Sequence, residues 1–394
     1  MAGGAPVRPP GRFLVFGAPV IGEAEIAGVV DCLRRRWIGT GPKAQEFEQE
    51  FARYKRAPHA VAVSSGTAAL HLALLAMGVG PGDEVIASAM TFCSAVNAVV
   101  HTGATPVLAD CDRRSFNIGA DRIVERINDR TKAIMVVHMC GRCCDMGPIM
   151  ELARARGLVV IEDCAHAIEA EYHGTPAGLI GDIGCFSFYA TKNLTTAEGG
   201  MVLTRDASVA SEIKTLANQG MSADAWGRFS DDGYRHYTVV RAGFKYNMPD
   251  IHAGIGLAQL RRLEQHAARR VEIWRRYNER LSDLPCVLPP AEEPRTRHAR
   301  HLYTPLLELE KLSITRDQVL EALAAENIGA GVHFIPVHRH LYYRSFWRKG
   351  EFPNAEFIGE RTLSLPLAGD LDDEDVEDVC RALRRILTYY VRRK

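Results

Sequence analysis

The sequence predicts an α/β protein with a large domain built on a mainly parallel sheet over residues 1–250, followed by a connecting helix and a smaller α+β domain over residues 251–394. Two observations predict this fold. Short apolar runs alternate with helical patterns from residue 60 to about residue 205, which is typical of βαβ units. Further along the chain, a long helical pattern gives way to mixed strand and helix patterns, as expected of a second domain.

Seven short apolar runs in the first domain are the predicted strands. Helical patterns separate most of these runs, so successive strands can cross over and lie parallel in one sheet. The predicted strands are residues 60–63, 84–87, 106–109, 133–137, 158–162, 185–188 and 200–204.

The second part of the chain begins with a helix predicted over residues 251–281, where Leu257, Leu260 and Leu263 recur at helical spacing. A Pro-rich break at residues 284–294 follows this helix. The elements expected after the break are a strand near residues 302–307, a helix begun by a capping box of Thr315 and Gln318, a strand within residues 329–334, and a helix within residues 370–393 whose acidic start and basic end complement its dipole.

Composition and charge exclude several classes of function. Lys plus Arg and Asp plus Glu both number 48, so no long-range field gathers nucleic acid or anionic lipid. The N-terminus lacks the apolar run of a signal peptide, and no stretch approaches the ~18 apolar residues of a membrane helix. We therefore expect a cytoplasmic protein that binds neither nucleic acid nor membrane. The cluster Cys140, Cys143 and Cys144 lacks a second ligand pair at zinc-ribbon spacing, so we expect buried thiols and no metal site.

The first candidate site follows the predicted strand at residues 60–63. There Ser65, Gly66 and Thr67 lead into a helical run, which places small residues and free amides at a helix N-terminus. Such a terminus binds phosphate. An ordinary strand-to-helix turn has the same pattern, so this motif alone does not decide between the two.

Two further motifs lie where other strands end. Asp163 and His166 follow the apolar run at residues 158–162, and a carboxylate there could hold a protonated ring nitrogen while the imidazole contacts a ring substituent. Lys192 follows the run at residues 185–188, and a buried lysine with a depressed pKa is a nucleophilic amine. Taken singly, the aspartate could be a helix cap and the lysine a surface residue. Together with the phosphate motif they meet the requirements of pyridoxal phosphate.

With these three motifs, the chain resembles the DegT/DnrJ/EryC1/StrS family of sugar aminotransferases, which have the fold-type I architecture of aspartate aminotransferase. The resemblance covers nearly the whole chain. The segments that carry it are RWIGTGPKAQEFE, SSGTAAL, GDEVIASAMTF, VIEDCAHA, FSFYATKNLTTAEGGM, GFKYNMPDIHAGIGLAQL and GAGVHFIPVH.

The resemblance assigns roles around pyridoxal 5′-phosphate, with pyridoxamine phosphate as the intermediate form. Lys192 is implied to bind the cofactor as a Schiff base, Asp163 to pair with its ring nitrogen, and His166 to contact its hydroxyl. The residues implied to complete the cofactor site are Gly66, Thr67 and Ser187 at the phosphate, Phe92 stacked on the ring, and Asn247 reaching the phosphate of the neighbouring subunit. The resemblance therefore implies a homodimer with shared active sites.

Within the family, the chain looks most like enzymes that aminate C4 of nucleotide-linked keto sugars, of the UDP-4-amino-4-deoxy-L-arabinose aminotransferase type. On that likeness Arg228 and His333 are candidates for the sugar-nucleotide side, although a solvated loop arginine and a packed histidine are competing interpretations. Tyr189, His252 and the segment HMCGRCCDM depart from the family pattern, but none of these positions is one of the implied cofactor residues.

The resemblance implies a two-stage reaction in which an amino acid, L-glutamate, gives its amino group to the cofactor and a keto sugar nucleotide then receives it. Lys192 is implied to move a proton between the Cα atom of the amino acid and the C4′ atom of the cofactor. Amination at C3 of a keto sugar, or of a keto-cyclitol, stays open as an alternative. A sugar dehydratase has histidine in place of the lysine, and a non-catalytic regulatory relative would lose Lys192 or Asp163, so the presence of both residues argues against these two classes.

Overall fold

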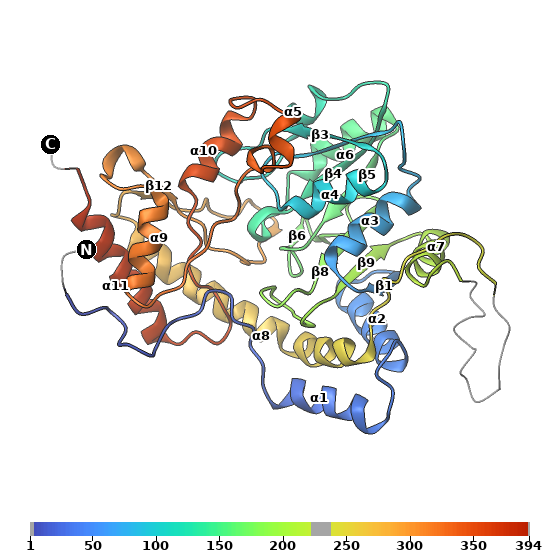
Figure 1. Cartoon of the computed structure of the whole chain (residues 1–394), viewed down its shortest axis with the longest axis horizontal. Coiled ribbons are helices and arrows are strands. Elements are labelled where there is room, and N and C mark those ends of the chain that lie inside the picture. Colours follow the sequence, from blue (N-terminus) through green and yellow to red (C-terminus); the bar gives the residue numbers. More distant parts are fainter. Residues whose placement is uncertain (1–3, 222–237, 393–394) are drawn as a thin grey trace.

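A seven-stranded sheet lies at the centre of the computed structural model, which describes residues 4–221 and 238–392 (Figure 1). In order across the sheet the strands are β1 (His59–Val63), β9 (Gly200–Thr204), β8 (Ile183–Ser187), β5 (Val159–Asp163), β4 (Thr131–Val137), β2 (Glu84–Ser88) and β3 (Thr105–Ala109). The five strands from β8 to β3 run parallel, whereas β9 is antiparallel to both of its neighbours. All seven predicted strands are confirmed, with ends displaced by at most about two residues.

Helices cover both faces of this sheet because successive strand side chains point to opposite sides. Ile161 and Cys185 pack on one face, and their neighbours Val160 and Phe186 pack on the other. The first face carries α3 (Gly66–Ala76), α4 (Cys93–His101) and α7 (Ala207–Ala217), and the second carries α2 (Pro42–Lys55), α5 (Ala120–Val124) and α6 (Met146–Arg156).

The long helix α8 (Asp250–Leu281) confirms the helix predicted over residues 251–281. Its first half packs on α2 and on α1 (Glu23–Arg34), while Ile273 and Tyr277 in its second half enter a separate C-terminal core. Figure 1 shows α8 running from the sheet toward the helices at the C-terminal end of the chain.

The elements after α8 are short. They are β10 (Cys286–Val287), β12 (Leu306–Leu307), the 3-10 helices η3 (Leu309–Lys311), η4 (Val337–Arg339) and η5 (Tyr343–Ser345), and the helices α9 (Arg316–Ala325), α10 (Pro353–Arg361) and α11 (Asp373–Tyr389). A small sheet joins β11 (Thr296–Arg297) to β6 (Glu171–Tyr172) and β7 (Thr175–Pro176), and η1 (Met139–Gly141) follows β4. The predicted capping box of α9 is confirmed, because the Gln318 N–H donates to Thr315 Oγ1 (3.3 Å) and the Thr315 N–H donates to Gln318 Oε1 (2.9 Å). The predicted C-terminal helix is confirmed as α11.

Two predictions for this part of the chain were wrong in detail. The strand expected near residues 302–307 is reduced to β12, and the strand expected within residues 329–334 is absent from the described structure. Gly331 pairs with Ser364 in a single antiparallel bridge, and His333 and Phe334 then line the pocket beside Lys192. The backbone at residue 331 therefore pairs with Ser364 through one bridge only, and residues 329–334 form no β-ladder.

Core residues from beyond position 251 pack in both halves of the molecule. Leu302, Leu306 and Val337 join the core around α3 and α4, whereas Leu383 and Leu387 join the C-terminal core. The division into domains at residues 250 and 251 therefore stays a prediction. In the described part of the chain, no helix is both long enough and apolar enough to cross a membrane.

Candidate functional site

A cavity of about 290 Å³ lies where β1, β4, β5 and β8 end, at the carboxyl edge of the parallel strands. This edge is the usual ligand site of such sheets. The structure brings eight of the predicted site residues together in its wall: Gly66, Thr67, Phe92, Asp163, His166, Ser187, Lys192 and His333.

The floor of the cavity is a cup formed by the start of α3 and the end of β8. Ser65 caps α3 by accepting a hydrogen bond from the Ala68 N–H (3.0 Å), and the first amides of the helix have no partner within it. A Cβ atom on Gly66 would lie 2.7 Å from Cβ of Ser187, so only glycine leaves this space open. Strand β9 lies between the two halves of the cup and pairs Gly200 with both Val63 and Ser187. The cup fits a phosphate group.

Asp163 is buried at the end of β5, with only 5% of its surface exposed. One carboxylate oxygen accepts a hydrogen bond from the Ala165 N–H (3.0 Å). Burial raises the pKa of Asp163, while that hydrogen bond and the positive charge of Lys192 oppose the rise. A buried carboxylate without an ion-pair partner in the described chain is suited to a protonated ring nitrogen.

Lys192 lies in the loop after β8 and lines the same cavity as Asp163. Within residues 4–221 and 238–392, no carboxylate lies close enough to form an ion pair with its amine. Burial lowers the pKa of Lys192 to about 8, against the opposing effects of Asp163 and Cys140. A substantial fraction of the amine is therefore neutral and nucleophilic near neutral pH.

His166 is buried beside these two residues. Its Nδ1 accepts a hydrogen bond from the Cys140 N–H (3.3 Å), so its proton lies on Nε2. Burial and the charge of Lys192 hold the pKa of His166 well below its usual value, which keeps the ring neutral. Nε2 is thus a hydrogen-bond donor, as a contact with a cofactor hydroxyl requires.

Aromatic rings form the mouth of the cavity. The Phe92 ring is about half exposed, and its centroid lies 5.4 Å from that of Phe334. Nδ1 of His333 is hydrogen-bonded to Ser364 Oγ (2.8 Å). Burial lowers the pKa of His333 to about 4. The sequence analysis did not identify Phe334 as a site residue, although the segment GAGVHFIPVH contains it. The exposed face of Phe92 is available to stack on a planar ring.

One predicted residue of the described chain, Asn247, is not part of this cavity wall. Asn247 donates to Thr40 Oγ1, and its backbone forms a bridge with Val63, outside the cavity of its own chain. Its contact with a neighbouring subunit stays a prediction. Arg228 lies outside the described residues.

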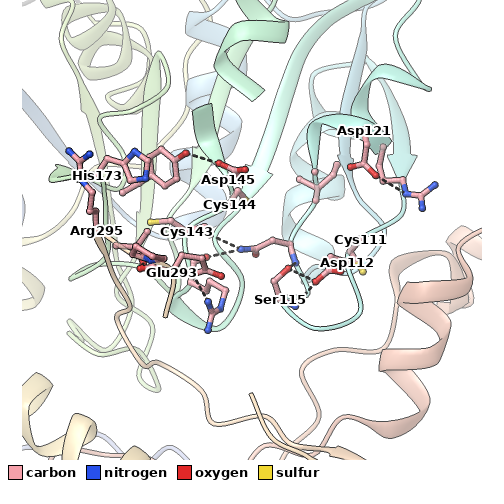
Figure 2. Close-up of a pocket in the computed structure, with 18 of the residues that line it drawn as sticks. Cys111, Asp112, Ser115, Asp121, Cys143, Cys144, Asp145, His173, Glu293 and Arg295 are labelled. Carbon is pink, nitrogen blue, oxygen red and sulfur yellow. Dashed lines mark hydrogen bonds and ion pairs between the residues drawn. The ribbon is translucent and has the colours of Figure 1, made fainter. Parts of the chain in front are cut away.

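A larger cavity of about 620 Å³ lies beside the loops that follow β3 and β4 (Figure 2). Some of its polar groups are paired with one another: Arg142 with Glu293, and the Tyr172 hydroxyl with Asp145 (2.6 Å). Burial raises the pKa of Cys143, which lines this cavity, to about 12, so the thiol is unreactive.

Among the described residues, one buried group has the residue types of a metal site: His138, Glu162 and Cys164. The oxygens of Glu162 already accept hydrogen bonds from His138 Nε2 (2.9 Å) and from three backbone N–H groups at residues 178, 180 and 181. A metal ion would displace these bonds. These hydrogen bonds instead anchor the loop at residues 178–181 to Glu162, the residue before Asp163.

Several known proteins are similar to this chain over nearly its whole length. The spore coat polysaccharide biosynthesis protein SpsC of Bacillus subtilis strain 168 is 47% identical over 379 residues, covering 95% of this chain and 97% of SpsC. Spr1654 from Streptococcus pneumoniae, provisionally assigned as a sugar aminotransferase, has in its PMP form a TM-score of 0.89 at 33% identity, covering 95% of this chain and 99% of that one.

The aminotransferase TlmJ from Streptoalloteichus hindustanus has a TM-score of 0.88 at 34% identity, covering 96% of this chain and 100% of that one. These similarities confirm the predicted aminotransferase fold. Residues 19–384 match the model of a single family. The chain belongs to the DegT/DnrJ/EryC1/StrS aminotransferase family.

Proposed function

We propose that the protein transfers an amino group from an amino acid, L-glutamate, to the C4 keto group of a sugar nucleotide, using pyridoxal 5′-phosphate. The observation that carries this proposal is Lys192, whose amine has no ion-pair partner among the described residues and lines the same cavity as the buried Asp163. The start of α3 adds a phosphate cup at the floor of the same cavity. Cup, carboxylate and amine together match the three parts of this cofactor.

Each residue has a separate task in this proposal. When bound, pyridoxal phosphate supplies an aldehyde that condenses with amines and a ring that accepts electrons. Lys192 holds the cofactor. Once released, its amine moves a proton between the Cα atom of the amino acid and the C4′ atom of the cofactor. Asp163 keeps the ring nitrogen protonated, and His166 donates through Nε2 to the ring hydroxyl. Gly66, Thr67 and Ser187 bind the phosphate.

Support for a sugar acceptor comes from the relatives. SpsC is named for polysaccharide biosynthesis, and Spr1654 for sugar amination. The mouth of the cavity places the Phe92 and Phe334 rings beside His333, and a sugar ring can pack against such aromatic faces. We assign His333 and Arg228 to the sugar-nucleotide side, and Asn247 to the phosphate of a second subunit in a cytoplasmic homodimer.

The purified protein tests the proposed reaction directly. We expect a visible absorption band from bound pyridoxal phosphate that L-glutamate bleaches and one keto sugar nucleotide restores, with the aminated product identified by mass spectrometry and NMR. A panel of 4-keto and 3-keto sugars, with a keto-cyclitol, distinguishes C4 amination from the alternatives. A protein that binds no pyridoxal phosphate would overturn the cofactor assignment, and one that glutamate bleaches but only a 3-keto sugar restores would overturn the C4 assignment.

The lowered pKa of Lys192 predicts how cofactor capture depends on pH. A lysine reacts as the neutral amine, so the capture rate of the apoprotein rises with pH and levels off above about pH 8. A lysine peptide, with an unshifted pKa of about 10.4, continues to gain rate up to about pH 10. Stopped-flow absorbance after mixing with pyridoxal phosphate measures both. A protein profile that follows the peptide would contradict the assignment of the reactive amine to Lys192, which lines the cavity.

A further inference from the structure

His301 lies beside the proposed site, although it follows no predicted strand and stands in no motif. Only 6% of its surface is exposed, and its ring centroid lies 4.4 Å from that of His166 at an interplanar angle of 38°. The charge of Lys192 lowers the pKa of His301, after the larger effect of burial, which places the imidazole near that amine and keeps it neutral.

One edge of His301 holds the residue next to Lys192. Its Nδ1 lies 3.0 Å from Oδ1 of Asn193. The amide nitrogen of Asn193 donates to the Glu169 carboxylate (2.9 Å to Oε2) and to the Ala299 carbonyl (3.0 Å), which fixes Oδ1 as the remaining acceptor. His301 must therefore carry its proton on Nδ1 and donate it to Asn193. Glu169 is itself held by an ion pair with the buried Arg270.

The other side of His301 is tied to His166 through Cys140. The Cys140 N–H donates to Nδ1 of His166 (3.3 Å), and the Cys140 carbonyl accepts from the His301 N–H (3.1 Å). Cys140 reaches both partners from a left-handed conformation, with φ of 58°. A single peptide segment therefore sets the relative position of the two neighbouring imidazoles.

We propose that His301 is a positioning residue of the Lys192 site: its Nδ1 holds Asn193, and thereby the lysine loop, while its ring holds His166 in the orientation that donates through Nε2. This inference rests on the proposed function. It assigns His301 no contact with the reacting atoms. The segment around His301 follows the long helix α8 in sequence. Residues from beyond α8 therefore help to determine how the Lys192 amine and the His166 imidazole face the cofactor.

Two substitutions separate the two contacts. His301→Phe keeps a ring against His166 but removes the donor to Asn193. His301→Asn keeps a donor near the position of Nδ1 but removes the ring. His298→Asn is the matched control, because His298 is also buried, accepts a hydrogen bond from the Arg300 N–H (2.8 Å) and packs on Trp274, outside the cavity wall.

The readouts are the dissociation constant for pyridoxal phosphate and the fraction of bound cofactor that borohydride reduction attaches to the protein, measured by intact mass. We expect His301→Phe to reduce the attached fraction, because the lysine loop loses a hydrogen bond. We expect His301→Asn to raise the dissociation constant by up to about tenfold, the effect of one misplaced hydrogen bond. His298→Asn leaves both quantities at the wild-type value, although its melting temperature falls.

Wild-type values of both quantities in the two folded His301 variants would overturn the proposal and leave His301 a packing residue. If neither variant folds, Asn193→Ala carries the test on the same readouts, since it removes the partner of His301 and keeps the ring in place. A wild-type protein that captures no pyridoxal phosphate would instead refute the proposed function, so the two failures are distinguishable.

Discussion

Replacing Lys192 with alanine is expected to lower turnover by on the order of 10⁴-fold, the upper range for loss of a positioned acid–base group. The variant loses both the covalent attachment of the cofactor and the base that moves the proton. Because the cup at Gly66 and the carboxylate of Asp163 remain, we expect it still to bind pyridoxal phosphate without a covalent link. Single-turnover absorbance with L-glutamate and borohydride trapping measure the two effects separately.

Lys132→Ala is a suitable control for this substitution, since Lys132 is an exposed lysine at the start of β4. It is expected to keep wild-type turnover. Lys192→Arg keeps the positive charge but cannot act as a neutral amine, so it is expected to be as inactive as the alanine variant. Turnover at the wild-type rate in Lys192→Ala would remove the central assignment.

The second large effect is expected from Asp163→Asn, which keeps the shape of the side chain and removes its charge. We expect turnover to fall by on the order of 10²- to 10³-fold, as when a preorganised electrostatic contact is removed from a transition state. Without the carboxylate the ring nitrogen loses its proton and accepts electrons less well. Weaker binding of pyridoxal phosphate accompanies this loss, because the pair between carboxylate and ring nitrogen is buried.

The pyridoxal phosphate analogue methylated at its ring nitrogen makes this prediction specific. Its fixed positive charge does not depend on Asp163, so we expect the analogue to narrow the difference between wild type and Asp163→Asn. Asp112→Asn, an exposed carboxylate in the loop after β3, controls for a general loss of negative charge. An Asp163→Asn protein as active as wild type would show that another group protonates the ring.

The sheet could be predicted from the sequence because its strands are apolar runs, and those inside the sheet, such as β2, β5 and β9, are buried on both faces. That signal is local. The segment at residues 329–334 has a similar apolar composition, yet its backbone leaves Ser364 after one bridge. Whether an apolar run pairs with a neighbour depends on what lies beside it in space, and the sequence pattern does not contain this information.

The same distinction explains which site residues could be predicted. Asp163 and Lys192 each follow a strand, and parallel strands bring their ends to one edge of the sheet. His301 has no such marker, because it reaches the site through contacts with Cys140 and Asn193, which lie more than 100 residues away in sequence. The role predicted for Asn247 requires a second subunit, so a single chain leaves that role a prediction.

The central place of β9 in the cup has a consequence for folding. The two halves of the cup come from residues about 120 positions apart, and they meet only when the antiparallel strand Gly200–Thr204 has paired with both β1 and β8. Contacts of such long sequence separation form slowly. A ligand of this cup therefore binds only chains that are already folded, and at 100 times its dissociation constant it adds about 2.7 kcal/mol to their unfolding free energy. In this protein the supply of cofactor and the fraction of chains that are folded are thus thermodynamically linked.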